Sequence, residues 1–146
     1  MDEKKHPRVG VAVMFVRDGK VLLGHRHDDP EKADSLLHGE GTWTIPGGKL
    51  DFHEKPTEGA KREAVEECNL EPKELKFISV ANEVVPDAHF VTLGFLCKEF
   101  EGEVKTMEPD EITEWKWFDF NDLPKRMFPP ALKIIKNYLD REVYKH

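Results

Sequence analysis

The 146-residue sequence contains only two cysteines, Cys68 and Cys97, which are too few for a scaffold built on disulfide bonds. No apolar run approaches the ~18 residues that a membrane-spanning helix needs, and the N-terminal stretch MDEKKHPR lacks the apolar core of a signal peptide. Basic residues are in deficit, because 22 Lys and Arg stand against 29 Asp and Glu for a net charge of −7. That charge disfavours indiscriminate binding to nucleic acid or to anionic lipid. We therefore expect a cytoplasmic protein whose partners are neither nucleic acids nor membranes.

The sequence also lacks internal repeats, low-complexity tracts and linker-like stretches. A chain of this length buries about 68–70% of its unfolded surface, which is enough for a hydrophobic core without disulfides or zinc. Nine Phe, three Trp and two Tyr argue against disorder. These features predict one domain over residues 1–146.

Apolar runs and turn signals divide the chain into strands and helices. The Asp18-Gly19 pair between two apolar runs is a strong hairpin signal, and residues 28–41 have the composition of an exposed loop. Pro56 suits the first turn of a helix and Asn69 the left-handed residue after its end. We predict strands at residues 9–16, 20–24, 42–45, 75–85, 89–100 and 112–120, and helices at 56–68 and 129–144. This order predicts an α+β domain with a layered sheet.

The predicted helix at residues 56–68 carries three glutamates on one side. With Glu63 placed at 0°, Glu66 falls at about −60° and Glu67 at about +40°. We expect the opposite side of the helix to pack on the sheet through Ala64, Val65 and Cys68. Clustered carboxylates are hard oxygen ligands that suit Mg²⁺, Mn²⁺ or Ca²⁺. The pattern therefore indicates a divalent metal site.

A plainer interpretation of the same helix is a solvated charged face, with Arg62 paired to Glu66 four residues later. The segment before the helix favours the metal site, because two glycines and an isolated glutamate precede the helix at a fixed offset. Two features of the helix itself are compatible with a bound ion. Glu63 and Glu67 form a like-charge pair that destabilises a bare helix and that a cation would stabilise. Gly59 lies on the same stripe, and since a helical glycine costs roughly 0.5–1 kcal/mol relative to Ala, we expect its missing side chain to make room for another group.

The segment around this helix resembles a known motif. Gly48, Glu54 and the run REAVEECNL at residues 62–70 follow the pattern G-x5-E-x7-R-E-U-x-E-E-x-G-U, the Nudix box. All six fixed residues from Gly48 to Glu67 match. Ala64 is smaller than the usual aliphatic residue, and Asn69 replaces the second glycine, although Asn also tolerates a left-handed helix end. The box spans residues 48–70, and the likeness in element order extends over most of the chain.

The resemblance implies the Nudix fold, a mixed β-sheet layered between helices in an α/β/α sandwich. It also implies a hydrolase of nucleoside diphosphate-linked compounds that uses Mg²⁺, with Mn²⁺ as an alternative. By the resemblance, Glu63 and Glu67 are metal ligands and Glu66 is either a further ligand or the base that activates water. Gly47 is the expected backbone-carbonyl ligand, and an acidic loop supplies another carboxylate, for which Glu108 is the better match.

Supporting residues follow from the same resemblance. Glu111 is the second choice for the ligand in the acidic loop, and an acidic loop is also a common solvent-exposed turn. Glu54 is expected to stabilise the ligand cluster without binding the metal itself. Arg62 is expected to pair with the glutamates and orient them. We therefore assign the catalytic group to Arg62, Glu63, Glu66 and Glu67.

Substrate contacts are expected from outside the helix. Arg26 is a candidate phosphate contact because a guanidinium grips phosphate with two donors, although a simple surface cation is equally compatible with its position. Lys49 is a further candidate. The segment 128–132 resembles the part of MutT-like enzymes that lines the nucleobase pocket, and Phe90 is either its opposite wall or a core residue. These substrate-binding candidates are Arg26, Lys49, Phe90, Phe128 and Leu132. A zinc site is rejected for lack of cysteines at finger spacing near His25, His27 and His38.

Three functions remain open. The first is a MutT-like nucleoside triphosphate diphosphatase that releases a nucleoside monophosphate and pyrophosphate. The second is a pyrophosphatase of ADP-ribose, nucleotide sugars or dinucleoside polyphosphates. The third, from another class, is a non-catalytic nucleotide sensor with the same fold. A homodimer is common among similar proteins, and the sequence leaves the oligomeric state, the base and the attacked phosphorus open.

Overall fold

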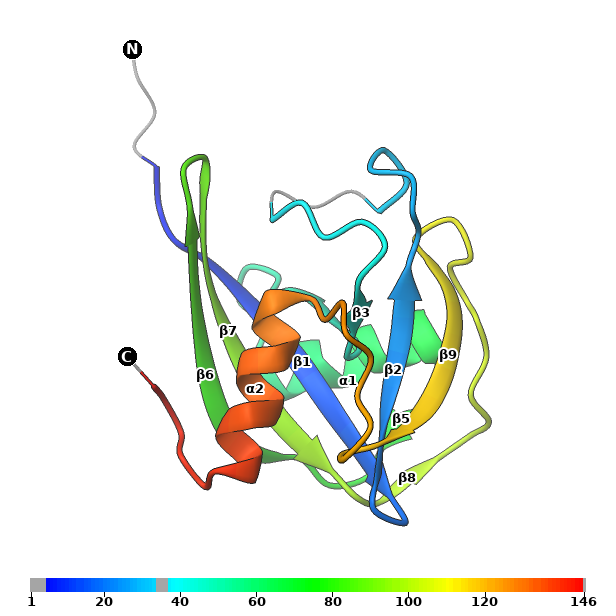
Figure 1. The fold of residues 1–146 in the computed structure, drawn as a ribbon. Coiled ribbons are helices and arrows are strands. Elements are labelled where there is room, and N and C mark those ends of the chain that lie inside the picture. Colours follow the sequence, from blue (N-terminus) through cyan, green and yellow to red (C-terminus); the bar gives the residue numbers. More distant parts are fainter. Residues whose placement is uncertain (1–4, 34–36, 146) are drawn as a thin grey trace.

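The computed structural model describes residues 5–33 and 37–145 (Figure 1). Its elements, in chain order, are β1 (Arg8–Arg17), β2 (Lys20–Arg26), β3 (Trp43–Thr44), β4 (Gly47–Lys49), α1 (Pro56–Cys68), β5 (Glu71–Pro72), β6 (Lys76–Val85), β7 (Ala88–Cys97), β8 (Phe100–Glu101), β9 (Ile112–Asp119) and α2 (Pro129–Leu139).

A mixed sheet forms the middle layer of the molecule. Its strand order is β3-β2-β1-β7-β6, with β4 paired to β1 and β9 paired to β2. Strand β1 runs parallel to β7 and antiparallel to β2 and β4. Figure 1 shows α2 in front of this sheet and α1 behind it. The predicted α+β fold, with a mixed sheet layered between helices, is confirmed.

The alternation of side chains along β1 explains why both faces need a helix. Val11, Val13 and Phe15 pack in the cluster that contains Ala60, Ala64 and Cys68 of α1. Ala12 and Met14, which point the other way, pack in the cluster that contains Ala131, Ile134 and Ile135 of α2. Because every residue of this run is buried on one face or the other, β1 shows no polar alternation in the sequence.

Helix α1 has the predicted bounds, but the side of the helix that packs on the sheet differs from the predicted side by a rotation about the helix axis. Val65 was predicted to face the sheet and is 43% exposed. The buried side is centred near Ala64, and Val65 lies about 100° from it. The same rotation brings Glu67, about 60° from Ala64, to the buried side.

Several other predicted bounds are wrong. Helix α2 ends at Leu139, not at residue 144, and the predicted strand at 89–100 ends at Cys97, after which β8 pairs with β5. Strand β4 was not predicted, because Pro46-Gly47-Gly48 reads as a strand terminator. Its glycines allow the chain to lie against β1, since a Cβ on Gly47 would meet the Val11 carbonyl oxygen at 2.4 Å.

The cysteines and the helix lengths bear on two expectations from the sequence. Cys68 and Cys97 are both buried free thiols, and burial raises the pKa of Cys68 to about 12. Within residues 5–33 and 37–145, neither helix is long and apolar enough to cross a membrane.

The end of α1 provides a stability test. Asn69 has φ 65° and ψ 20°, and its Nδ2 donates to the Glu103 carbonyl at 3.0 Å. Asn69→Ala should lower the free energy of unfolding by about 1–2 kcal/mol, because alanine is strained in this left-handed conformation. Asn69→Gly relieves the strain and should cost less than alanine. Urea denaturation measures both, and equal losses for the two variants would contradict this explanation.

Candidate functional site

A cleft of about 630 Å³ opens where β1 and β4 meet the two helical layers. Acidic side chains from α1 and from the loop before β9 line one part of it: Glu63, Glu66, Glu67, Glu108 and Glu111. Apolar side chains line another part, which includes the start of α2: Leu37, Phe90, Phe128, Pro130, Ala131 and Ile134. Figure 1 shows α1 and α2 on opposite faces of the sheet. The acidic lining residues Glu63, Glu66 and Glu67 therefore come from one helical layer, and the apolar residues Pro130, Ala131 and Ile134 from the other.

The guanidinium of Arg62 holds several carboxylates on α1 and the preceding loop. Its Nε donates to Glu54 Oε2 at 2.8 Å, and its Nη1 donates to Glu63 Oε1 at 2.8 Å and to Glu66 Oε2 at 3.3 Å. Its Nη2 donates to the Lys49 carbonyl at 3.1 Å. The hydrogen bonds from Arg62 hold the pKa of Glu54 at about 2, and the same bonds raise the pKa of Arg62. Arg62 therefore ties β4, the Glu54 loop and α1 together.

Two glycines leave space for these carboxylates. A Cβ on Gly59 would meet Glu54 Oε1 at 2.7 Å and Leu50 Cδ1 at 2.8 Å. The group for which Gly59 makes room is thus the Glu54 loop. A Cβ on Gly48 would meet the carboxylate of Glu63 at 2.5–2.6 Å, so β4 and α1 approach each other only because residue 48 has no side chain.

Glu67 occupies a different environment from the other glutamates of α1. Its side chain is buried, with 9% of the residue exposed, and its Oε1 accepts a hydrogen bond of 2.6 Å from the Gly47 N–H. Burial raises the pKa of Glu67 well above its usual value, although the Gly47 N–H opposes this shift. The predicted ligand role of the Gly47 carbonyl stays a prediction.

The acidic loop brings two more carboxylates to Glu67. Carboxylate oxygens of Glu67, Glu108 and Glu111 all lie within 4.8 Å of one another. From the sequence, Glu63, Glu66 and Glu67 were predicted to converge as one set. In the structure Glu63 and Glu66 bind Arg62, and the side chain of Glu66 is 51% exposed. The angular positions of the glutamates around the helix could not show that Glu67 separates from Glu63 and Glu66. This separation depends on the acidic loop, which lies more than 40 residues away in the sequence.

The three grouped carboxylates have the donor chemistry of a divalent metal site. Across residues 5–33 and 37–145, Glu67, Glu108 and Glu111 form no ion pair with Lys, Arg or His. Burial raises the pKa of Glu108, and the charges of Glu111 and Glu66 raise it further. Oxygen ligands crowded in this way and lacking a protein cation fit Mg²⁺ or Mn²⁺.

Most of the predicted substrate contacts line the cleft, and one does not. Lys49, Phe90 and Phe128 line the cleft, whereas Leu132 is not among the described residues that line it. Arg26 also lines the cleft, but its Nε donates to the Gly39 carbonyl at 2.9 Å and its Nη2 to the Ala33 carbonyl at 2.8 Å. Its guanidinium carbon lies 4.6 Å from the centre of the Phe128 ring. Arg26 thus fastens the loop after β2 above the apolar side, and its phosphate contact stays a prediction.

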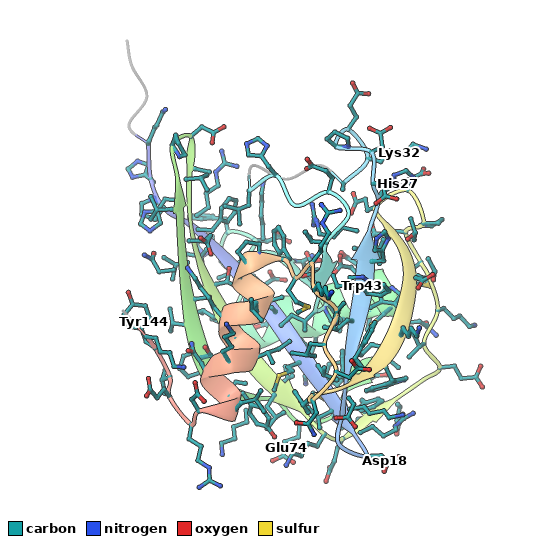
Figure 2. All side chains as sticks on the ribbon, viewed as in Figure 1. Asp18, His27, Lys32, Trp43, Glu74 and Tyr144 are labelled. Atoms are coloured by element: carbon teal, nitrogen blue, oxygen red, sulfur yellow. The ribbon has the colours of Figure 1, made fainter. Side chains whose placement is uncertain are left out.

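Sequence reasoning missed Arg8, a third cation that lines the cleft. It is the first residue of β1 and pairs with Phe90 of β7. A single arginine before an apolar run gives no signal, because only the parallel β1–β7 pairing places it at the cleft. His27 lies in the loop after β2 (Figure 2), where its Nδ1 accepts a hydrogen bond from the Asp29 N–H, and it takes no part in the acidic group.

Comparison with known proteins decides the family. The NUDIX domain family model matches residues 4–138. The chain belongs to the Nudix family. An ADP-ribose pyrophosphatase of Methanocaldococcus jannaschii is 33% identical over 136 residues, which cover 92% of this chain and 74% of that protein. Among solved structures, a MutT NUDIX hydrolase from Burkholderia pseudomallei superposes with a TM-score of 0.81 at 30% identity, over 90% of this chain and 98% of that one.

Other Nudix relatives are longer proteins. The NAD-capped RNA hydrolase NudC of Photorhabdus laumondii is 26% identical over 141 residues, covering 94% of this chain. The match covers 49% of that protein, so the chain spans about half the length of this NudC relative. The predicted family and enzyme class, a Nudix hydrolase, are confirmed.

The raised pKa values predict how the stability of this Nudix protein should depend on pH, with and without added Mg²⁺, if the grouped carboxylates bind the ion. In the folded protein, the pKa values of Glu63, Glu67 and Glu108 lie above 4.5, the ordinary value for a glutamate carboxyl. These carboxyls therefore bind protons more tightly in the folded protein than in the unfolded chain. The metal-free protein therefore loses stability as pH rises above 4.5, while metal binding requires the deprotonated form. The rise in Tm on adding Mg²⁺ should be larger at about pH 8 than at about pH 5.5.

Calorimetry or thermal-shift measurement with and without Mg²⁺ checks this expectation. Glu54 has the opposite shift, to about 2, but its contribution changes only as pH falls below 4.5 and does not interfere. A Mg²⁺ effect on Tm that is constant with pH, or that shrinks as pH rises, would contradict the metal site.

Proposed function

We propose that this Nudix hydrolase cleaves nucleoside triphosphates to nucleoside monophosphate and pyrophosphate. The observation that supports this most is the division of one cleft into an acidic side on α1 and an apolar side at the start of α2. A nucleoside triphosphate has the same division, with a flat apolar base at one end and a polyanionic chain at the other. A cleft of about 630 Å³ is within the usual range for sites of small ligands.

The acidic side supplies the hydrolytic chemistry. Glu67 and Glu108, with Glu111 beside them, would hold the cation, and Glu63 lies next to them on α1. Bound Mg²⁺ supplies charge neutralisation of phosphate oxygens and lowers the pKa of water. A carboxylate of α1 accepts the proton as the oxygen of water attacks phosphorus and the P–O–P bridge breaks. Glu66 is the half-exposed candidate for this base.

Cations at the cleft suit the phosphate chain. Arg8 and Lys49 line the cleft on the neighbouring strands β1 and β4. For a protein with net charge −7, these groups and the metal offset the repulsion of a polyanionic substrate. The apolar side, with Phe128 and Phe90, supplies flat surface for the base.

A second candidate is the hydrolysis of ADP-ribose. It is favoured by the relative from Methanocaldococcus jannaschii, which is named as an ADP-ribose pyrophosphatase and matches over most of both chains. Both substrates contain a diphosphate bridge and one base, so the same acidic and apolar sides serve either one. They differ in the leaving group, which is pyrophosphate in the first case and a sugar phosphate in the second.

Product analysis on a panel of nucleoside triphosphates and ADP-ribose separates these candidates. The proposal expects a nucleoside monophosphate and pyrophosphate from a triphosphate with Mg²⁺ present. Glu66→Gln should lower that rate by about 10²–10⁴-fold, because it removes the proposed proton acceptor, whereas the matched control Glu58→Gln, on the exposed side of the same helix, should retain it. Hydrolysis of ADP-ribose alone would replace the first candidate by the second. No hydrolysis of either would reject both.

The apolar side predicts a separate kinetic effect. Phe128→Ala should raise KM and leave kcat nearly unchanged, because the ring would contact the base and not the reacting phosphorus. Phe52→Ala is the control, since Phe52 is 91% exposed and is not among the described residues that line the cleft. Steady-state kinetics on the preferred substrate measures both variants. A fall in kcat with KM unchanged would show that the nucleobase of the substrate does not bind against Phe128.

A further inference from the structure

The backbone carbonyl of Glu67 has an unusual set of partners. An α-helix leaves its last four carbonyls without partners inside the helix, and Glu67 is the penultimate residue of α1. Its carbonyl accepts a hydrogen bond of 3.1 Å from the indole Nε1–H of Trp115 and one of 3.4 Å from the Met107 N–H. The next carbonyl, of Cys68, accepts one of 3.0 Å from the Lys105 N–H.

All three donors belong to the segment that carries the acidic loop. Met107 directly precedes Glu108, and Trp115 lies on β9 just after the loop. The loop itself is closed by hydrogen bonds from the Glu111 and Ile112 N–H groups to the Glu108 carbonyl, both of 2.9 Å. The segment is thus fastened, before and after Glu108, to the backbone of the residue whose carboxylate meets Glu108.

The indole of Trp115 is held in one orientation. Trp115 pairs with Gly24 across β9 and β2, and a Cβ on Gly24 would meet the Trp115 ring at 2.6 Å. The ring therefore lies directly over the glycine backbone and packs in the core cluster under α1. This packing directs the N–H at the end of the helix.

We infer that Trp115 is a positioning residue for the metal site: its indole N–H, by holding the Glu67 carbonyl, sets the spacing between the carboxylates of Glu67 and Glu108. The inference rests on the metal site of the proposed function. Spacing matters because a metal site tolerates little displacement of its ligands, and partners that orient ligands typically contribute 10–100-fold in metal affinity. A tryptophan that only filled the core would stabilise the fold without this effect on affinity.

The test removes the donor and keeps a ring. Trp115→Phe should raise the Kd for Mn²⁺, measured by electron paramagnetic resonance of the free ion, by about tenfold or more. The matched control is Trp117→Phe, two residues along the same strand. Trp117 packs against the same core cluster and stacks on Phe100, and no hydrogen bond of its indole is among the described contacts. Trp117→Phe should lower Tm and leave the Kd for Mn²⁺ unchanged.

A second pair of variants covers the case in which Trp115→Phe fails to fold. Met107→Pro removes the other N–H that reaches the Glu67 carbonyl, and Met107→Ala removes only a side chain that is 47% exposed. The proline variant alone should weaken Mn²⁺ binding. Unchanged binding by folded Met107→Pro would show that bonds to the Glu67 carbonyl do not set the carboxylate spacing, and would overturn the inference.

The outcomes separate this inference from the proposed function. If Glu67→Gln weakens Mn²⁺ binding but folded Trp115→Phe binds within twofold of the unaltered protein, the positioning role is overturned and the metal site stands. If Glu67→Gln itself leaves the Kd unchanged, the metal site is wrong and the inference falls with it. Equal losses for Trp115→Phe and Trp117→Phe would assign the effect to core packing.

Discussion

The burial of the Glu67 carboxylate beside two other carboxylates is the constraint on which the rest of this structure depends. Removing an ionised group from water and placing like charges near it both disfavour the folded state. The protein offsets part of this cost with the Gly47 N–H, which reaches Glu67 Oε1 because β4 lies close against β1. The position of Gly47 in β4, the orientation of α1 and the docking of the acidic loop all determine the surroundings of this one carboxylate.

Much of the fold was accessible from the sequence because local rules act on it. Helix α1 was placed with its bounds by Pro56 and by Asn69, whose left-handed conformation ends the helix. The Asp18-Gly19 turn located the β1–β2 hairpin in the same way, since both turn residues have positive φ. The helix α2 was overextended, because apolar residues continue after Leu139 although Asp140 ends the helix.

The site was less accessible, because its assembly depends on pairings distant in the sequence. The motif identified the glutamates of α1, but a helical wheel gives no depth and therefore placed Glu66 with Glu67. Glu108 came from a resemblance, and its approach to Glu67 is set by a hydrogen bond from Trp115, 48 residues from Glu67. Arg8 reaches the cleft only through the parallel pairing of β1 with β7, for which the sequence holds no local signal.

The two groups of carboxylates differ in what balances their charge. This difference determines where on the protein a cation from solution binds. Arg62 contributes one permanent positive charge to Glu54, Glu63 and Glu66, and so offsets part of their negative charge from within the protein. Glu67 and Glu108 pair with no cationic side chain among the described residues, so no side chain offsets their negative charge where α1 meets the acidic loop. A cation from solution gains most by binding there, because Glu63 and Glu66 each already bind the positively charged guanidinium through one oxygen. Arg62 thereby favours cation binding at Glu67 and Glu108 without contacting the ion.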